Sequence, residues 1–561
     1  MTGSILQFRP SALYVAMALS LPMVTALAQT AQVQAGLTWS AVANSGTDIP
    51  GSSPARKFSS FNQPSVNSLG MVVLRARGKG DEGQGEPLRG IYTRQMGSVA
   101  GPLVPAFDTL TTVPKPNNIL YSDQLGKFTE FPAFPRIGMY DNTVATRGQS
   151  KPVWSYLLMP DQTETRLGTS GVYVANQGKR VSAATQLGPV PGFEYFAVPG
   201  APKGTKFDQF PGSPAVANRN AVVFKGNYTD GVPKTGIFFH WYDFQELTTF
   251  NTQVIASSNT LIPGQTSVRF GSTAPPSASL VDAVFLGLDN EETPTLGGIY
   301  RAPLLSNPKL QTLVSIGSQV PGELSGENFN RLGEALSYDG RFVAFWGAWG
   351  TTTRTVNLKC AEDGQKAVIA FCKAKYPEGY AVPVPANQGF FVHDALLRKT
   401  YAIVKTGAVY QDFLYWTFSG RPPGVGDEHT VTATGLATTT TPESVDEGED
   451  FEEPRWRATA FVSTFGPLGS PQVAFKGRKA SAPVTIDGIY LTAVPTTQYP
   501  IRTVVETGMD GSVIDPLAAG VPVISVGLER DGLRNGWLAI AASMANEVKS
   551  WAGVYVARPS R

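Results

Sequence analysis

The sequence predicts an all-β fold, a seven-bladed β-propeller, and the first observation that predicts it is an internal repeat. A strand that opens with glycine, an apolar residue and an aromatic recurs along the chain. Its seven anchors are Gly90, Gly171, Gly236, Gly298, Gly389, Gly488 and Gly553. The shortest spacings between anchors, 62 to 65 residues, set the length of the unit, and the longer spacings indicate insertions.

The second observation is that each unit contains four short strands. An apolar strand precedes every anchor, at residues 71–77, 143–147, 221–225, 282–286, 341–346, 472–476 and 537–542. Shorter strands lie upstream, as at 58–66, 128–137 and 207–216, and downstream, as at 181–192, 254–264, 313–322 and 504–508. Short strands separated by Gly, Pro, Asn and Asp are typical of an antiparallel array. Four strands in each of seven units favour a propeller over a β-helix, whose repeats are much shorter.

The third observation is that the two ends of the chain complement each other. The seventh unit stops after its third strand, and residues 38–51 near the N-terminus resemble the fourth strands of the other units. We therefore expect an N-terminal strand to complete the last blade and close the ring, which leaves no large unpaired sheet edge.

The turn before the second strand also carries a family resemblance. Asn67-Ser-Leu-Gly70, Asn218-Arg-Asn-Ala221 and Asp339-Gly-Arg-Phe342, each followed by an apolar strand, resemble the NxxGxxAF tandem-repeat exported proteins. Units four and seven depart from the motif, with Leu280-Val-Asp282 and Arg534-Asn-Gly536 at this place. The resemblance implies a secreted repeat protein of propeller-like fold, with no defined activity and no catalytic residues.

Residues 1–28 have the pattern of a secretory signal peptide. An apolar run follows Arg9, contains Pro22, and ends in the small-residue site Ala26-Leu-Ala28. The alternative is a membrane anchor, but the run is short for a bilayer span of about 20 apolar residues. We expect residues 29–561 to form one propeller, secreted or periplasmic, with no membrane span once the signal is removed.

Composition agrees with this class and excludes others. Charged residues make up 16% of the chain, Gly (58) and Pro (43) are abundant, and the net charge is +2. A balanced charge argues against a nucleic-acid partner and against binding by bulk charge. We expect a monomer.

The two cysteines, Cys360 and Cys372, are predicted to form a disulfide, since an exported chain with one close pair of cysteines is oxidised. The alternative is a redox or metal pair, which the twelve-residue separation and the absence of a nearby His disfavour. With three His in all, a transition-metal site is not expected, and neither is any other cofactor.

Two insertions stand out, at residues 347–388 inside unit five and at 420–454 between units five and six. The second is rich in Thr and acidic residues, which indicates a solvated linker, although a calcium loop within 446–453 is the alternative. Both insertions are expected on one face of the ring, and inserted loops are where repeat proteins carry function.

Cationic and aromatic residues recur at what we take to be the last residue of the second strand. The residues at this place are Arg77, Arg147, Lys225, Leu286, Trp346, Lys476 and Ala542. Cations bind carboxylates and sulfates, and a Trp face stacks on a sugar ring. We interpret Arg77, Arg147, Lys225, Trp346 and Lys476 as a ligand-binding rim. The alternative is a set of solvated strand ends, with Trp346 packed against Trp349.

These residues lead to three hypotheses about function. The first is a binding module or scaffold for an acidic polysaccharide or a cell-surface partner. The second is a polysaccharide lyase that uses Tyr228 or His240 as base and acid, with Arg147 and Lys225 neutralising a uronate carboxylate. The third is a protein–protein platform. His240, like His393, lies at the far end of a third strand, where a structural role is the alternative.

Overall fold

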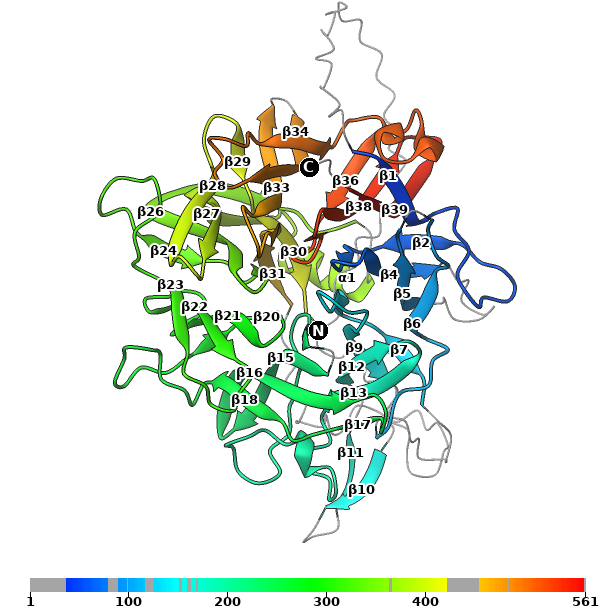
Figure 1. The fold of residues 1–561 in the computed structure, drawn as a ribbon, viewed down its shortest axis with the longest axis vertical. Helices are drawn as coiled ribbons and strands as arrows, with labels where there is room; N and C mark the ends of the chain where they lie inside the picture. Colours follow the sequence, from blue (N-terminus) through cyan, green and yellow to red (C-terminus); the bar gives the residue numbers. More distant parts are fainter. Residues whose placement is uncertain are drawn as a thin grey trace, which may run out of the picture.

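The computed structural model describes residues 37–558 except 79–88, 98, 117–125, 151–153, 159–162, 168–169, 219, 363–365, 421–453 and 482–483. Within these residues the chain folds into seven five-stranded antiparallel sheets arranged as blades around an axis (Figure 1). The prediction of a seven-bladed β-propeller is confirmed.

The first three blades follow the predicted units. Blade one consists of β2 (Phe58–Phe61), β3 (Ser65–Val66), β4 (Met71–Gly78), β5 (Arg89–Gln95) and β6 (Val104–Asp108). Blade two consists of β7 (Phe128–Glu130), β8 (Arg136–Ile137), β9 (Val144–Ser150), β12 (Ser170–Asn176) and β13 (Lys179–Thr185). Blade three consists of β14 (Ala215–Asn218), β15 (Ala221–Asp230), β16 (Val232–Asp243), β17 (Thr248–Thr249) and β18 (Gln253–Ser257).

The next two blades have the same order, and blade five contains the longest strands. Blade four consists of β19 (Ser272–Thr273), β20 (Ser277–Ala278), β21 (Asp282–Leu288), β22 (Gly297–Pro303) and β23 (Gln311–Ser315). Blade five consists of β24 (Phe329–Leu332), β25 (Ser337–Tyr338), β26 (Phe342–Leu358), β27 (Tyr380–Asp394) and β28 (Lys399–Lys405).

The last two blades complete the ring. Blade six consists of β29 (Tyr410–Asp412), β32 (Val462–Phe465), β33 (Gln472–Ser481), β34 (Val484–Ala493) and β35 (Arg502–Glu506). Blade seven consists of β36 (Val523–Gly527), β37 (Leu533–Arg534), β38 (Trp537–Ala545), β39 (Ser550–Ala557) and β1 (Trp39–Asn44). The remaining elements are β10 (Trp154–Leu158), β11 (Thr163–Leu167), β30 (Tyr415–Ser419), β31 (Arg455–Thr459), η1 (Glu194–Phe196), η2 (Gly511–Val513), η3 (Pro516–Ala518) and α1 (Lys366–Lys375).

The N-terminal strand closes the ring as predicted. β1 pairs antiparallel with β39, from Trp39 opposite Ala557 to Asn44 opposite Gly553. Strands from the two ends of the described chain therefore share one sheet. β1 is the fourth strand of the last blade and covers the edge of β39 that would otherwise be unpaired.

An aromatic pair is built into six of the seven blades and explains the repeated sequence pattern. The first aromatic of the inner strand lies edge-on to the aromatic of the third strand, with ring centroids 4.8 to 5.3 Å apart. In blade three these rings are Phe207 and Phe238, and a Cβ at Gly226 would lie only 2.5 Å from the Phe207 ring. Glycine is required there because the inner ring lies flat against the backbone of the second strand.

The inner strand of most blades is in two pieces, and this corrects the position of the second insertion. β29 and β32 both pair with β33, and the hairpin of β30 and β31 lies between them in the chain. The insertion at 420–454 was expected between units five and six, but it interrupts the inner strand of blade six. Its residues 421–453, including the alternative calcium loop at 446–453, lie outside the described residues, as does the predicted signal peptide.

The insertion at 347–388 extends β26 and β27 beyond the sheet and carries α1 between them. We call the end of the ring where the second and third strands are joined the upper face. Figure 1 shows α1, β30 and β31 near the centre of the ring. Val368 and Cys372 of α1 pack with Phe418 of β30 and Trp456 of β31, so the two insertions form one cap.

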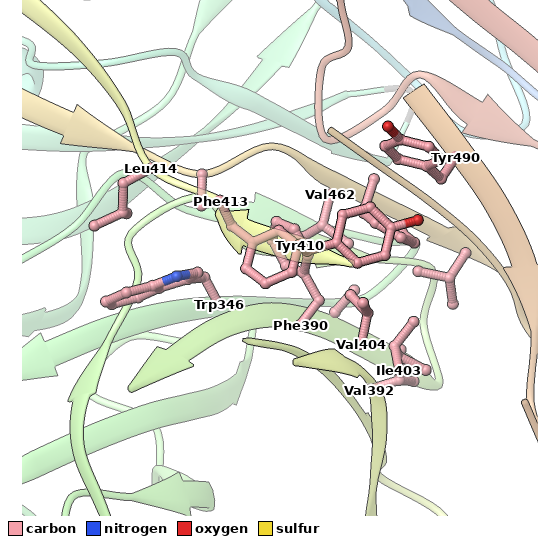
Figure 2. Packing of buried hydrophobic residues seen from close by; sticks show 14 of the residues in the cluster. Trp346, Phe390, Val392, Ile403, Val404, Tyr410, Phe413, Leu414, Val462 and Tyr490 are labelled. Carbon is pink, nitrogen blue, oxygen red and sulfur yellow. The ribbon is translucent and has the colours of Figure 1, made fainter. Parts of the chain in front are cut away.

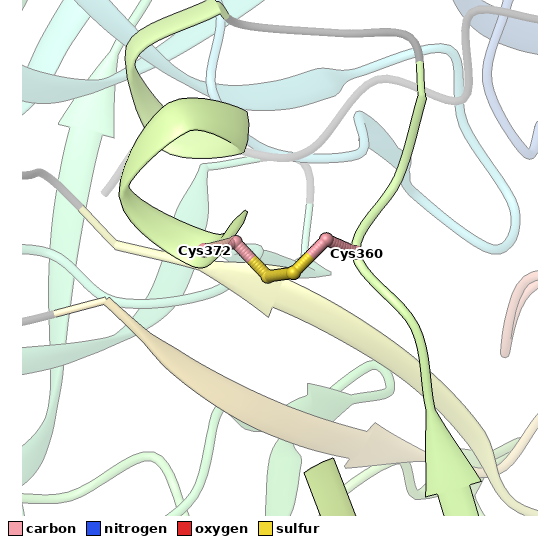
Figure 3. The surroundings of a disulfide bond; sticks show 2 residues. All are labelled: Cys360 and Cys372. Carbon is pink, nitrogen blue, oxygen red and sulfur yellow. A yellow bond between two sulfur atoms is a disulfide. The ribbon is translucent and has the colours of Figure 1, made fainter. Parts of the chain in front are cut away.

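The predicted disulfide is present and lies in this cap. Cys360 follows β26 and Cys372 lies in α1, with Cα atoms 5.9 Å apart. Figure 3 shows the bond joining the helix to the extended segment above the neighbouring strands. The disulfide thus fixes α1 to the strand that leads into it.

Below the cap, charged residues from several blades meet. Arg136 of blade two and Arg534 of blade seven both form ion pairs with Asp531, and all three are buried. Arg136 also donates to Ser277 of blade four over 3.2 Å. These contacts link blades two, four and seven, which are distant in the sequence.

Candidate functional site: buried cations below the cap

Strand pairing corrects the alignment on which the cationic rim was based. The anchor glycine of the third strand pairs with Gly148, Gly226, Gly287, Gly347 and Gly477 in blades two to six. In blade one it pairs with Ala76, and in blade seven with Ala542. The equivalent residues just before these positions are therefore Arg75, Arg147, Lys225, Leu286, Trp346, Lys476 and Ala541. We call this place the ring position; Arg77 lies two residues beyond it and Ala542 one.

The ring position is not at the end of a strand. β15 continues to Asp230 and β26 to Leu358. Apolar residues at the ring position pack in the core between one blade and the next: Leu286 contacts the cluster of blades four and five, and Ala541 that of blades seven and one. Arg75, Arg147, Trp346 and Lys476 are accordingly buried and Lys225 is half-buried, so the alternative of solvated strand ends does not describe their placement, while ligand binding at this position stays a prediction.

Trp346 occupies the ring position of blade five and packs there as an apolar side chain. It packs with Phe390 of its own blade and Phe413 of blade six (Figure 2). Its Nε1 donates to Gln388 over 2.9 Å. It belongs to a different cluster from Trp349, so the alternative of a Trp346–Trp349 pair is wrong as well. Its ring is 6% exposed and presents no open face to a sugar.

Two of the four cations at the ring position have partners that account for their burial. Arg75 forms an ion pair with Glu130 of blade two, which also binds Arg89. Burial alone would raise the pKa of Glu130, but Arg75 and Arg89 lower it below its ordinary value. Lys476 lies 3.8 Å from the centroid of the Tyr415 ring at the base of the hairpin, and burial lowers its pKa to about 8.

Arg147 lacks such a partner. It is 4% exposed, and its Nε is buried with no hydrogen-bond partner among the described residues. Burial and then the charge of Arg75 lower its pKa to about 10. A buried guanidinium with an unused donor is energetically expensive, so Arg147 is the residue at this position that packing explains least.

Lys225 lies among charges contributed by other blades and by the hairpin. Burial lowers its pKa, Glu334 and Glu291 raise it, and Arg457 and Arg455 lower it further. Arg455 of β31 reaches Glu291 of blade four over 2.7 Å. The hairpin that leaves blade six therefore extends to blade four, and it brings two more arginines toward Lys225.

The described residues around Arg147 and Lys225 carry an excess of positive charge. Arg75, Arg89 and Arg77 act on Glu130, and Arg75 also acts on Arg147. Glu334, Glu291, Arg457 and Arg455 act on Lys225, whereas Lys476 has Asp487 and Arg478 beside it. Arg455 is 41% exposed at its side chain, so this charge reaches solvent on the side of blade four. We call Arg147, Lys225, Lys476 and these charged neighbours the cation cluster.

The residues suggested for lyase chemistry are not brought together. His240 pairs with Val222, Lys225 with Ile237, and Tyr228 with Lys234 along the same two strands. At about 3.3 Å a residue, His240 and Tyr228 are on the order of 20 Å apart along the sheet. Both are buried, and burial lowers the pKa of His240 to about 3.

The remaining expectations about sites concern His and metals. His393 is buried and its Nδ1 lies 3.0 Å from Thr400 Oγ1, which fits the structural alternative; His429 lies outside the described residues. The described part of the chain brings no three His, Cys, Asp or Glu side chains together as metal ligands. None of its helices is long and apolar enough to cross a membrane.

Sequence reasoning missed the carboxylates and the hairpin arginines of the cation cluster. Glu130 and Glu334 lie beside breaks in inner strands, where no repeat marks them. Arg455 and Arg457 belong to an insertion whose position was assigned to the wrong place in the blade. The expectation that both insertions lie on one face of the ring was the sequence signal that could have placed these arginines near the ring position.

No protein-family model matches the chain, and no curated protein is similar to it in sequence, so the NxxGxxAF resemblance stays a prediction. Among solved structures, a Trypanosoma rangeli sialidase in complex with the inhibitor DANA aligns with a TM-score of 0.34 and 11% identity, and 82% of this chain covers 60% of the sialidase. A hypothetical selenium-binding protein from Sulfolobus tokodaii aligns with a TM-score of 0.24 and 10% identity, covering 70% of this chain and 71% of that one. The chain thus spans less than two thirds of the sialidase. The assignment of a seven-bladed propeller rests on the strand pairing of this chain and not on these alignments.

Proposed function

We propose that this protein is an exported binding module for an acidic polysaccharide, and that the cation cluster below the cap holds the carboxylate or sulfate groups of its ligand. The observation that carries the proposal is the buried Arg147, whose Nε has no hydrogen-bond partner among the described residues and whose charged neighbour is a second arginine, Arg75. The cost of burying such charges is recovered when an anion binds them.

Comparison among the blades supports this proposal. Three blades have Leu286, Trp346 or Ala541 at the ring position, so packing between blades needs only an apolar side chain there. The other four blades have Arg or Lys. Arg can bind a carboxylate or sulfate through two parallel hydrogen bonds, which suits an anionic sugar.

The disulfide supports the proposed location. Disulfides persist in oxidising compartments outside the cytoplasm, and the only two cysteines of the chain are joined. A secreted or periplasmic module would meet acidic polysaccharides at a cell surface.

Lyase chemistry has no specific observation in its favour. A lyase needs a base close to the sugar whose carboxylate is neutralised, whereas His240 and Tyr228 lie apart and are buried. Binding without elimination is therefore the function that the geometry supports best.

Retention on immobilised alginate and dextran sulfate tests the proposal. The double variant Arg147→Ala/Lys225→Ala should lose about a hundredfold or more in affinity, since each of the two lost charge-assisted contacts contributes about 1.5–3 kcal/mol. Lys399→Ala is the matched control, because Lys399 is an exposed lysine on the opposite face of the ring. Wild-type retention should fall steeply with added salt.

Equal retention of the double variant and the Lys399→Ala control would refute the cation cluster as the site. Ultraviolet absorbance of unsaturated uronate, followed in the same mixtures, separates binding from elimination. A rise in that absorbance would replace the binding module with a lyase.

A further inference from the structure

An open cleft on blade three has the side chains of a sugar-binding site and lies apart from the cation cluster. Its volume is about 420 Å³, and it is lined by Tyr195, Trp241, Thr249, Phe250, Asn251 and Gln253. Gly236 of β16 pairs with Gly226, the residue after Lys225, and so marks the upper part of this strand. Trp241 pairs with Ala221 near the other end of β16. The cleft is therefore at the lower end of the blade, opposite the cap.

The aromatic residues of the cleft are accessible. Phe250 is 53% exposed, and Tyr195 and Trp241 are half-buried, although large aromatic rings are buried elsewhere in the same blade. None of the six described lining residues is charged. Asn251 and Gln253 supply amide groups that both donate and accept hydrogen bonds.

The backbone behind the cleft is held in place by a buried histidine. His240 Nδ1 lies 2.8 Å from Phe250 O, and its Nε2 lies 2.7 Å from Thr252 Oγ1. Thr252 in turn donates its backbone N–H to Tyr195 O over 2.9 Å, and its Oγ1 lies 2.9 Å from the same oxygen. The loop with Phe250 and the helix η1 with Tyr195 are thus fixed relative to each other, so the cleft is preformed.

We propose that this cleft binds a neutral pyranose unit of a glycan. A sugar ring has apolar C–H faces that pack on aromatic side chains and hydroxyl groups that pair with amides. The volume falls in the range of small-molecule sites, about 300–1,000 Å³. The uncharged lining favours a neutral sugar, in contrast to the anions proposed for the cation cluster.

The test is a titration of the full-length protein with neutral oligosaccharides, using cellohexaose, maltohexaose and mannohexaose as probes. Tryptophan fluorescence should change on addition of one of them, because Trp241 lines the cleft. Phe250→Ala should weaken that binding by about tenfold or more, since it removes one stacking face. Phe250 is exposed enough that its removal leaves the core intact.

Two comparisons make the result decisive. Leu305→Ala removes a side chain that is 62% exposed on the neighbouring blade and should bind as wild type does. Arg147→Ala/Lys225→Ala should also keep the neutral-sugar response, which separates this cleft from the site proposed for acidic polysaccharides. A flat wild-type response to all three probes, or an unchanged affinity in Phe250→Ala, would overturn the inference.

Discussion

At the scale of single residues, Lys476 of the cation cluster shows the unfavourable free energy of burying a charge. Lys476 is 8% exposed, and burial lowers its pKa to about 8 from an ordinary value of 10.5. The Tyr415 ring beneath it offsets part of this cost through a cation–π contact at 3.8 Å. The pKa of Lys476 is higher in the unfolded chain than in the folded protein. Between about pH 8 and about pH 10 the unfolded chain therefore binds more protons at this residue than the folded protein does.

Lys476→Met should therefore stabilise the protein near neutral pH, by up to about 3 kcal/mol, while weakening its retention on alginate. The pKa shift is the net effect of burial and of the groups around the ammonium, and it corresponds to about 3 kcal/mol. In the wild type, stability contributed at this residue should rise as pH increases from about 8 to about 10, because folding then releases a proton. Urea unfolding of both proteins across this pH range measures the effect. A variant that is less stable than the wild type at neutral pH would contradict it.

At the scale of elements, the cap depends on one covalent bond. α1 is only ten residues long, and isolated helices shorter than about 12 residues are marginal in water. The disulfide from Cys372 to Cys360 and the packing of Phe418 and Trp456 hold it above the ring. The blades beneath have their own cores, so the cap can open without unfolding the propeller.

Reduction of wild-type protein should loosen the cap selectively. A disulfide across twelve residues contributes about 3 kcal/mol, so proteolysis within 359–379 should increase strongly while the ring stays folded. Mass spectrometry of limited digests locates the cleavage. Cys360→Ser/Cys372→Ser should show the same cleavage with or without reductant, because the chain has no other cysteine. Protection that survives reduction would show that packing alone holds the cap.

Elements with a fixed side-chain pattern could be predicted from the sequence, and elements without one could not. The number of blades follows from Gly236, Phe238 and their equivalents, because blades two to six share the same ring-on-glycine packing. The closing strand follows from the likeness of residues 38–51 to the fourth strands of the other units. The ring position in blade one was misassigned because Ala76 replaces the glycine, and Gly78 two residues later faces Ile49 instead. The cation cluster depends on contacts such as Arg455 with Glu291, which are 164 residues apart and belong to no repeat.

At the scale of the whole molecule, closure of the ring depends on Asp515 as well as on strand pairing. Its Oδ2 accepts hydrogen bonds from Asn44 of β1 over 2.9 Å and from Trp551 and Tyr555 of β39 over 2.9 and 3.0 Å. Its Oδ1 caps η3 by accepting from Leu517 N. One buried carboxylate thus joins the N-terminal strand, the C-terminal strand and the connection from blade six.

These hydrogen bonds also make ring closure sensitive to acid. Burial alone would raise the pKa of Asp515, but the donors from Trp551, Leu517, Asn44 and Tyr555 lower it. A carboxylate whose pKa is lowered in the folded state stabilises that state fully when the pH is above the pKa of the unfolded state, about 3.9. This stabilisation is lost as the pH falls through the lower pKa of the folded state. The closing contact should therefore weaken only below about pH 4.

Asp515→Ala should destabilise the protein by about 3 kcal/mol or more, because it leaves the donors of buried Asn44 and Tyr555 and of half-buried Trp551 without their acceptor. Asp510→Ala is the matched control: Asp510 caps η2 in the same connection, accepts from Ser512 N and Gly520 N, and contacts neither β1 nor β39. Thermal unfolding of both variants and the wild type, followed from about pH 6 to below about pH 4, separates closure from local capping. The wild type should approach the stability of Asp515→Ala in acid. If Asp510→Ala were as destabilised as Asp515→Ala, the effect would belong to the connecting segment, and the ring would be closed by the pairing of β1 with β39 alone.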